Sequence, residues 1–433
     1  MFSYYLDLAV RSLKRNVALT ILMIVAIAFG VGASMTTLTV LHVLSADPIP
    51  GKSERLFYVQ LEPRAADARR PGDNEPPDQV TRADAENLLR AARADHQAMM
   101  TGGAAAIEPD RPGLDPFYVD ARPTSADFFV MFDVPFVAGT GWSAADDTSN
   151  ARVAVIAKTL AEKLFGTTDV VGRPITVGGV ELRITGVIDA WRPTPHFYDL
   201  NVQDYGQTEQ LFLPFSTSRE IKITRNGSMN CWGQAEDPEA VGAPCDWIQF
   251  WVQLDSAEKV AAYRDFLVHY SEEQKRAGAY ELPPNVRLRN VLDWLDFKEV
   301  VPKDVKLQTW VALGFLVVCL INTVGLLLTK FLRRSSEFGV RRALGASKVS
   351  IFIQLLVESG LVGLIGGVAG LGLAWLGLWA VRQQPTSFAE LARLDLPMLV
   401  LTFLLAVISS LAAGVLPAWR GCQIAPAAQL KSH

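Results

Sequence analysis

The chain has 433 residues, half of them hydrophobic, and a mean hydropathy of +0.19. It is too apolar for an ordinary soluble enzyme and too polar to lie wholly within a membrane, so it must combine both kinds of segment. Residues 46–306 carry 28 Lys and Arg against 40 Asp and Glu, whereas the remainder carries 13 against 5. This distribution, with a net charge of −4, gives no indication of a nucleic-acid partner.

Four apolar runs are each long enough to cross a hydrocarbon core, which takes about 20 residues. They cover residues 17–44, 307–331, 351–381 and 396–419. Lys and Arg precede the first run and are concentrated in 332–350, and such residues are retained on the cytoplasmic side. We therefore expect the N-terminus, 332–350 and the 420–433 tail to be cytoplasmic, and 46–306 and 382–396 to be external. The first run is longer than the ~7–15 apolar residues of a cleaved signal peptide and is expected to stay as an anchor.

The external segment has the pattern of an α/β domain. Thr81 followed by Asp84 predicts a capped helix to about residue 94, and Gly178-Gly179 predicts a two-residue hairpin turn. Apolar and alternating patterns predict strands over 54–61, 153–156, 174–177, 180–188, 247–254 and 286–290, and helices over 158–165 and 257–274. Residues 291–306 are expected to continue into the second run as one long helix, because no strong breaker precedes Pro302.

Two of the four cysteines, Cys231 and Cys245, fall in the external segment. An oxidising compartment would join them, and the closed loop is worth about 3 kcal/mol by the chain-entropy estimate. Two free thiols are the alternative. Cys319 in the second run and Cys422 in the tail are expected to be inert, reduced thiols.

Small residues repeat at helical spacing in two of the runs. The third run contains the pairs Gly363/Gly367 and Gly366/Gly370, which allow helices to approach closely in lipid. Packing against other spans of the same chain is the favoured interpretation, and a ligand site is the alternative. Gly30 lies in a similar pattern in the first run, where an interface between two membrane chains is the alternative.

No motif for catalysis is present. The chain lacks the nucleotide-binding sequence G-x-x-x-x-G-K-[ST], the zinc-protease sequence H-E-x-x-H and the nucleophile elbow G-x-S-x-G. Its five histidines fall in separate predicted elements without the spacing of metal ligands. The sequence therefore predicts a non-catalytic chain that itself binds no metal or cofactor.

The basic segment after the second run predicts a short helix. Ser335 or Ser336 can cap it, Glu337 lies favourably in its first turn, and Gly345 ends it. Its surface would combine apolar and cationic side chains, namely Phe338, Arg341, Arg342 and Leu344. Composition alone favours a helix that lies on anionic lipid headgroups. The alternative is a helix that inserts into a groove on an acidic partner.

Glu358 is an acidic residue near the cytoplasmic end of the third run. A carboxylate at the centre of a span costs ~2.5–3.5 kcal/mol on insertion scales, and less near the interface. Glu358 is therefore a functional candidate that needs a partner. Arg342 and Gln354 are the expected local partners.

Three segments resemble MacB-like ABC transporter permeases, the type VII class that includes FtsX- and LolC-type chains. Residues 337–346 follow the signature E-x-G-[VI]-R-[KR]-A-[LV]-G-A, which comes after the second span in that family. Residues 126–188, from ADFFVMFDVPFVAG to the predicted hairpin, resemble its external domain, and 416–430 (LPAWRGCQIAPAAQL) resembles its tail. The match to the signature favours a protein partner over lipid for the basic segment.

The resemblance implies an α-helical membrane protein with four transmembrane helices and a large extracytoplasmic α+β domain made of two subdomains. Residues 47–115 and 246–300 would form one subdomain, and 116–245 would form the other. The matching residues would contact an ATPase subunit, which binds ATP and Mg; they are Glu337, Gly339, Arg341, Arg342, Gly345 and Ala346. Glu358 would be a hinge of this coupling region rather than a proton relay.

The function that the resemblance implies is mechanotransmission in the bacterial inner membrane. Two such chains, identical or homologous, would pair with an ATPase dimer whose closure moves the external domains. A tripartite pump with a periplasmic adaptor protein, exporting a peptide, an antibiotic or another amphipathic molecule, is the expected setting. Lipoprotein release is the alternative within the class, and a membrane-anchored ligand sensor is the alternative outside it.

Overall fold

The computed structural model describes residues 2–69, 72, 74–394 and 396–422. It divides into two compact units, one formed by Met1–Ser45 with Val301–His433 and the other by Ala46–Val300. Most of the predicted cytoplasmic tail, from residue 423 onward, lies outside the described residues.

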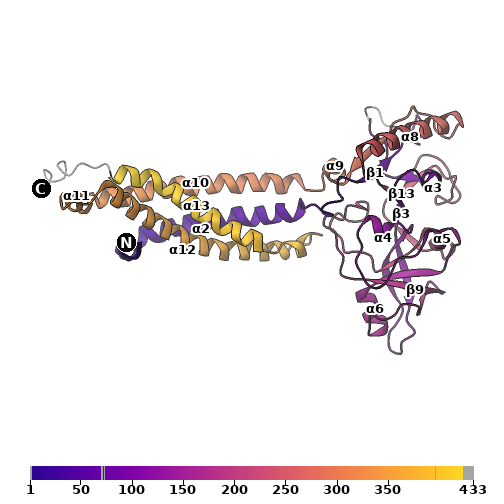
Figure 1. The fold of residues 1–433 in the computed structure, drawn as a ribbon, viewed down its shortest axis with the longest axis horizontal. Helices are drawn as coiled ribbons and strands as arrows, with labels where there is room; N and C mark the ends of the chain where they lie inside the picture. The colour runs from indigo at the N-terminus through magenta and orange to yellow at the C-terminus, as the bar shows by residue number, and fades with distance from the viewer. Residues whose placement is uncertain (1, 70–71, 73, 395, 423–433) are drawn as a thin grey trace. The chain divides into compact units, whose positions relative to one another are not determined.

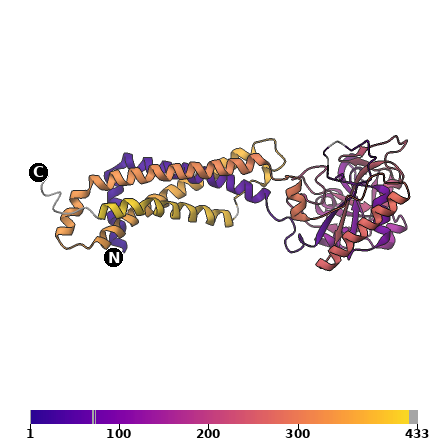
Figure 2. The ribbon, with the colours of Figure 1, turned by 90° about the horizontal axis from the view of Figure 1, so that it is seen from above.

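The first unit is a bundle of helices, with its long members side by side (Figure 1, Figure 2). Four helices in the described residues are long and apolar enough to cross a membrane. They are α2 (Val17–Leu44), α10 (Lys303–Arg333), α12 (Lys348–Arg382) and α13 (Leu396–Cys422), and each contains one of the predicted runs. The shorter elements are α1 (Phe2–Arg15), α11 (Ser335–Ala343) and the 3-10 turn η1 (Ala389–Leu391).

Glycines allow the long helices of this unit to approach one another closely. A Cβ atom added at any of the predicted packing positions would meet an atom of a neighbouring helix. Gly363 (2.0 Å) and Gly367 (2.6 Å) meet α13, Gly366 (2.8 Å) and Gly370 (3.1 Å) meet α2, and Gly30 of α2 (2.9 Å) meets α10. These contacts are made within the chain, which is the packing interpretation of the small-residue pattern.

The second unit is built on a sheet of fourteen strands in its described residues. The strands are β1 (Leu56–Gln60), β2 (Val80–Thr81), β3 (His96–Met100), β4 (Gly102–Glu108), β5 (Phe117–Thr124), β6 (Phe136–Gly139), β7 (Val153–Ala157), β8 (Pro174–Val177), β9 (Val180–Ile188), β10 (Leu211–Pro214), β11 (Thr224–Asn226), β12 (Asn230–Cys231), β13 (Cys245–Gln253) and β14 (Arg287–Asn290). The helices are α3 (Arg82–Ala91), α4 (Phe128–Met131), α5 (Ala144–Thr148), α6 (Lys158–Phe165), α7 (Phe215–Glu220), α8 (Ala257–Arg276) and α9 (Val291–Phe297).

The strand order joins distant parts of the sequence. The main path runs β11-β4-β8-β9-β7-β10-β5-β3-β13-β1-β14, with β6 beside β9 and with β2 and β12 beside β13. The pairs β7–β9 and β10–β5 are parallel, whereas the other pairs are antiparallel. Strand β13, which pairs with β1, β2, β3 and β12, is buried along its whole length, including its polar residues Asp246, Gln249 and Gln253.

Several local sequence patterns correctly predict the structure at their positions. The side chain of Thr81 accepts a hydrogen bond from the backbone N of Asp84 (3.1 Å) at the start of α3. Gly166 ends α6 with φ of 72°, a left-handed conformation that glycine adopts without strain. Gly178 and Gly179 both have positive φ between β8 and β9, which is the geometry of a type I′ hairpin turn.

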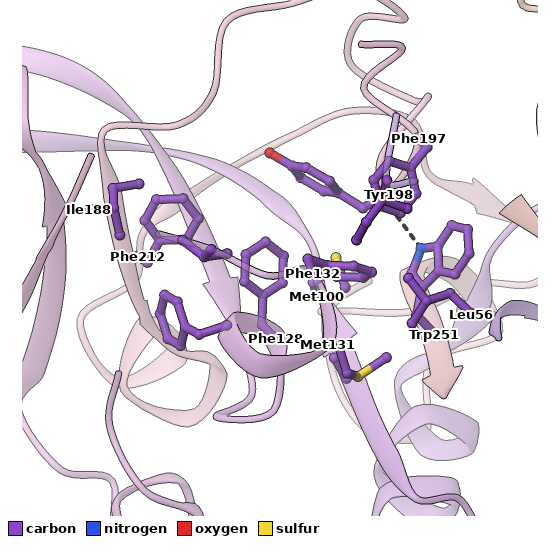
Figure 3. Packing of buried hydrophobic residues seen from close by; sticks show 14 of the residues in the cluster. Leu56, Met100, Phe128, Met131, Phe132, Ile188, Phe197, Tyr198, Phe212 and Trp251 are labelled. Atoms are coloured by element: carbon purple, nitrogen blue, oxygen red, sulfur yellow. Dashed lines mark hydrogen bonds between the residues drawn. The ribbon is translucent and has the colours of Figure 1, made fainter. Parts of the chain in front are cut away.

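Aromatic side chains fill the core beside β13 (Figure 3). Trp251 of β13 donates from Nε1 to the carbonyl oxygen of Tyr198 (3.1 Å), which anchors the 189–210 loop to the sheet. Phe132 stacks on Tyr198, and Phe128 meets the same ring edge-on. This cluster connects β13 with α4 and with β10, and so ties the 116–245 segment to the rest of the unit.

Of two predictions about this unit, one is wrong and the other remains untested. The single long helix expected from residue 291 is wrong: α9 ends at Phe297, Glu299 has φ of 50°, and Pro302 precedes α10. The division into two subdomains remains a prediction. Strand pairing does not follow its boundary at residue 115, because β4 pairs with β5, β8 and β11 of the 116–245 segment.

Candidate functional site

The candidate site is centred on α11, the short helix between α10 and α12. Arg334, not a serine, occupies its N-cap position, and no side chain in the described part of the chain caps it. Gly345, with φ of 101°, turns the chain after its end, and the side chain of Ser347 caps α12 by accepting from the backbone N of Ser350 (3.1 Å). The prediction of a helix that Gly345 ends is confirmed, whereas the predicted serine cap is wrong.

Glu358 of α12 is the centre of a buried charge network. Its side chain is 0% exposed; it accepts hydrogen bonds from Ser12 and Arg334 and forms an ion pair with Lys330. Lys330 Nζ of α10 lies 2.8 Å from Oε1, Ser12 Oγ of α1 lies 2.5 Å from the same oxygen, and Arg334 Nη1 lies 3.1 Å from Oε2. Arg334 Nη1 also donates to Ser12 Oγ (2.5 Å). Three stretches of the chain, at residues 12, 330–334 and 358, therefore meet at one carboxylate.

Glu337 of α11 is a second centre, and Arg334 connects it to the first. Arg334 approaches both carboxylate oxygens of Glu337 at 3.2 Å, and Arg341 Nη2 lies 3.0 Å from Oε1. Arg15 of α1 adds a longer contact of 3.7 Å. Partial burial would raise the pKa of Glu337, but the hydrogen bond and charge of Arg334, aided by Arg341 and Arg15, outweigh burial and lower this pKa. Glu337 is therefore ionised and holds α11 against its neighbours.

The two faces of α11 differ in character. Phe338 is 2% exposed, packs in the core of the helical unit and lies against the guanidinium of Arg334 (5.3 Å). The opposite side carries Val340, 57% exposed, and Leu344, 82% exposed. Exposed apolar side chains four positions apart form a stripe on a helix. We call Val340 and Leu344 the apolar stripe.

The predicted site residues divide between contacts inside the chain and the exposed side of α11. Arg341 bonds to Gln354 (3.1 Å) as well as to Glu337, so it belongs to the network inside the chain. Phe338 was expected on the exposed surface, which is wrong because its ring fills the core. Arg342, Gly339 and Ala346 are half-buried, and Gly345 is exposed at the turn.

The partners expected for Glu358 are also wrong. Neither Arg342 nor Gln354 contacts it; Lys330, Arg334 and Ser12 do. Lys330 carried a signal that sequence reasoning missed, since a lysine inside an apolar run needs a buried partner as much as a glutamate does. Nothing in the sequence marks Ser12, because only the packing of α1 against α12 brings it near.

Comparison with known proteins fits this arrangement. A model of the MacB-like periplasmic core domain matches residues 20–268, which is more than half of the chain. A model of the FtsX-like permease C-terminal region matches residues 310–426, which include α11 and both charge centres. The chain belongs to the MacB-like permease family. This MacB-like permease is thus a multi-pass protein of the inner membrane with a periplasmic domain.

Its curated relatives are longer. The macrolide export ATP-binding/permease protein MacB of Marinobacter nauticus is 28% identical over 438 residues, which cover 98% of this chain and 60% of the relative. MacB of Rhodospirillum rubrum is 25% identical to this chain, and the match covers 100% of this chain and 61% of the relative. The pyoverdine export ATP-binding/permease protein PvdT of Pseudomonas entomophila is 26% identical to this chain. That match covers 73% of this chain and 43% of the relative.

Among solved structures, the periplasmic region of MacB from Actinobacillus actinomycetemcomitans is similar. It is 12% identical, has a TM-score of 0.36, and the match covers 59% of this chain and 96% of that structure. In the described residues of this MacB-like permease, no group of three or more His, Cys, Asp or Glu side chains is placed to hold a metal ion.

Proposed function

We propose that this MacB-like permease is the membrane subunit of an ABC exporter and that α11 docks on a separate ATPase subunit. The observation that carries the proposal is the buried charge network, in which Glu358, Lys330 and Arg334 hold α11 to α1, α10 and α12. Separating these groups would leave charges buried without partners, which costs several kcal/mol. A displacement of α11 is therefore passed to three helices of the membrane unit.

The path of the chain supports transmission to the periplasm. The periplasmic unit begins two residues after the end of α2, and α10 begins three residues after the unit ends. The two helices that enter and leave the periplasmic unit thus belong to the bundle that the network holds together. Close packing at Gly30 joins α2 to α10, and Ser34 Oγ of α2 donates to the carbonyl of Ala312 of α10 (3.0 Å).

The partners follow from this role. An ATPase dimer would bind ATP and Mg and would receive α11, and a second permease copy or a homologous permease would complete the transporter. Relatives named for macrolide and pyoverdine export support an amphipathic molecule or peptide as the cargo. A periplasmic adaptor protein and an outer-membrane duct would then carry the cargo onward from the periplasmic domain.

The apolar stripe is the part of α11 that tests docking without disturbing the network. Charge reversal of Arg341 would also break its bonds to Glu337 and Gln354, so it cannot separate docking from folding. We expect the double substitution Val340→Ser with Leu344→Ser to reduce copurification of a co-expressed ABC ATPase by tenfold or more. Burying a leucine contributes about 1.5–3 kcal/mol, and about 1.4 kcal/mol is tenfold in affinity.

The matched control is Val130→Ser in the periplasmic unit, another exposed valine (58%) that lies far from α11 in the sequence. The control should copurify the ATPase and support transport as the wild type does. Undiminished copurification and ATP-driven transport in the stripe variant would refute docking through this face. A helix that lay only on lipid headgroups would give that result.

A further inference from the structure

A cavity in the periplasmic unit lies beside the only disulfide of the described residues. Its volume is about 570 Å³, which is in the range of small-molecule sites, ~300–1,000 Å³. Its walls come from Arg64, Ala68 and residues 75–78, from β12 and β13, and from the end of α9, where Phe297 lies. Trp232, directly after β12, forms an aromatic wall.

Most of the charged side chains around this cavity have partners of opposite charge. Asp78 pairs with Lys298 (2.5 Å), Glu75 pairs with Arg289 (2.7 Å), and Arg64 reaches a Glu62 oxygen at 2.7 Å. Each of these carboxylates is therefore compensated before any ligand arrives.

Asp246 of β13 is the exception. It lines the cavity, is 1% exposed and forms no ion pair with a described residue. Its Oδ1 accepts a hydrogen bond from the Asn230 side chain (3.1 Å), whereas its Oδ2 has no hydrogen-bond partner. Ionising a buried carboxylate without a cation is costly, so a cation that reached Asp246 would stabilise its charged form.

The disulfide holds this arrangement in place. Cys231 and Cys245 are joined, and they face each other in the register of β12 and β13. The neighbouring pair in that register is Asn230 with Asp246. Because the bond fixes β12 on β13, it fixes Asn230 on the carboxylate and Trp232 at the edge of the cavity.

We propose that this cavity binds an organic ammonium cation with an apolar body, with Asp246 as the counter-ion and Trp232 against the body of the ligand. An ammonium group supplies the hydrogen-bond donors and the charge that the carboxylate lacks. An aromatic face also attracts a cation electrostatically. Since the site is built wholly within the periplasmic unit, the inference does not depend on the docking of α11.

The affinity should depend on pH. Burial raises the pKa of Asp246 to about 7, and the charge of Asp78 adds to this rise, while Asn230 and Arg64 oppose it. Tyr58 of β1 also interacts with Asp246, and burial raises the pKa of its hydroxyl well above the usual value, so it stays uncharged. The cation binds the ionised carboxylate. Its affinity should therefore be full above pH 7 and fall by up to tenfold for each pH unit below it.

The test uses the full chain in detergent with phenethylammonium chloride as the probe and ligand-observed NMR as the readout. The neutral analogue 2-phenylethanol measures attraction to apolar surfaces alone. At pH 8 we expect Asp246→Asn to weaken phenethylammonium binding at least tenfold and to leave 2-phenylethanol binding unchanged. Asp169→Asn, which removes an exposed carboxylate elsewhere in the unit, should change neither.

Two further measurements keep the test independent of folding. Asp246→Asn removes an uncompensated buried charge, so its thermal unfolding midpoint should not fall below that of the wild type. Trp232→Ala, at a half-buried position, should weaken the probe several-fold while Asp246 remains. Wild-type affinity in a folded Asp246→Asn protein, or equal affinity at pH 5.5 and pH 8, would overturn the proposal.

Discussion

Burying the Glu358 carboxylate costs free energy because the charge loses its water, yet Lys330 needs this carboxylate as its counter-charge. Lys330 and Glu358 are both 0% exposed, so their attraction must offset the loss of water around two charges. Removing one partner of such a pair is far more damaging than removing both, because a single buried charge remains. Arg334 differs from Lys330, since it keeps its contacts to Glu337 when Glu358 is absent.

Losing one charge of the Lys330–Glu358 pair should therefore destabilise the protein more than losing both. Glu358→Leu should lower the free energy of unfolding by about 3–5 kcal/mol, because Lys330 is left buried without a counter-charge. Adding Lys330→Met should recover most of that loss. Thermal or denaturant unfolding of the two variants in one detergent measures the difference.

Asp7→Asn provides the control, because it breaks an exposed pair with Arg11 that is worth at most about 1 kcal/mol. If the single and double variants at Glu358 and Lys330 lost equal stability, the two residues would not act as a pair.

Single residues were only partly predictable from the sequence. Glu358 stood out because charge is rare in an apolar run, but its partners come from α1 and α10 and depend on packing that no local pattern encodes. Phe338 was misplaced for a related reason. A nine-residue helix with apolar residues on two sides does not reveal which side faces the protein, and here Phe338 faces inward while Leu344 faces outward.

At the scale of elements, the glycines of α12 set how closely three helices pack. Gly363 meets Ser410 of α13 so closely that a Cβ atom would lie 2.0 Å from the Ser410 Cβ. We expect Gly363→Leu to push α13 away from α12 and to destabilise the folded bundle by about 1–3 kcal/mol or more, as overpacking does. The unfolding midpoint in detergent is the measurement.

Gly372 is the matched control on the same helix. It is exposed and no atom of the described residues lies within 4 Å of an added Cβ, so Gly372→Leu should leave the midpoint nearly unchanged. A similar loss at both positions would show that the effect comes from replacing glycine in a helix rather than from the contact with α13.

Elements with strong patterns were predicted well and those without them were missed. The four membrane runs follow from length and hydropathy, and the β8–β9 hairpin follows from its two glycines. Strands β3 and β4, with sequences HQAMM and GGAAAIE, contain almost no β-branched residues and are held by pairing with β13 and β5. The break after α9 was missed because its positive-φ residue is a glutamate, which carries no such signal.

For the whole molecule, charge distribution and span number together predicted the arrangement of the chain across the membrane. The family of this chain agrees with a periplasmic domain between the first and second spans. Sequence patterns could not supply the meeting of Ser12, Lys330 and Glu358, nor the uncompensated Asp246 beside the disulfide, because both arise from contacts between distant segments. The family was therefore predicted more completely than the contacts between distant segments.

The orientation itself can be tested at two exposed positions. Thr167→Cys lies in the periplasmic unit and Ser336→Cys lies on α11, and both residues are exposed. In intact cells with a permeable outer membrane, a membrane-impermeant maleimide should label the cysteine at position 167. The cysteine at position 336 should be labelled only after the inner membrane is opened, because the basic residues around it are retained in the cytoplasm.

Both variants should carry Cys422→Ser, so that no native thiol of the cytoplasmic end contributes, while Cys231 and Cys245 are joined to each other. Labelling of both positions from outside would place α11 in the periplasm, where no ATP-driven subunit could reach it. That result would remove the physical basis for docking on an ATPase, whereas the opposite labelling of the two sites is what transmission from the cytoplasm to the periplasmic domain requires.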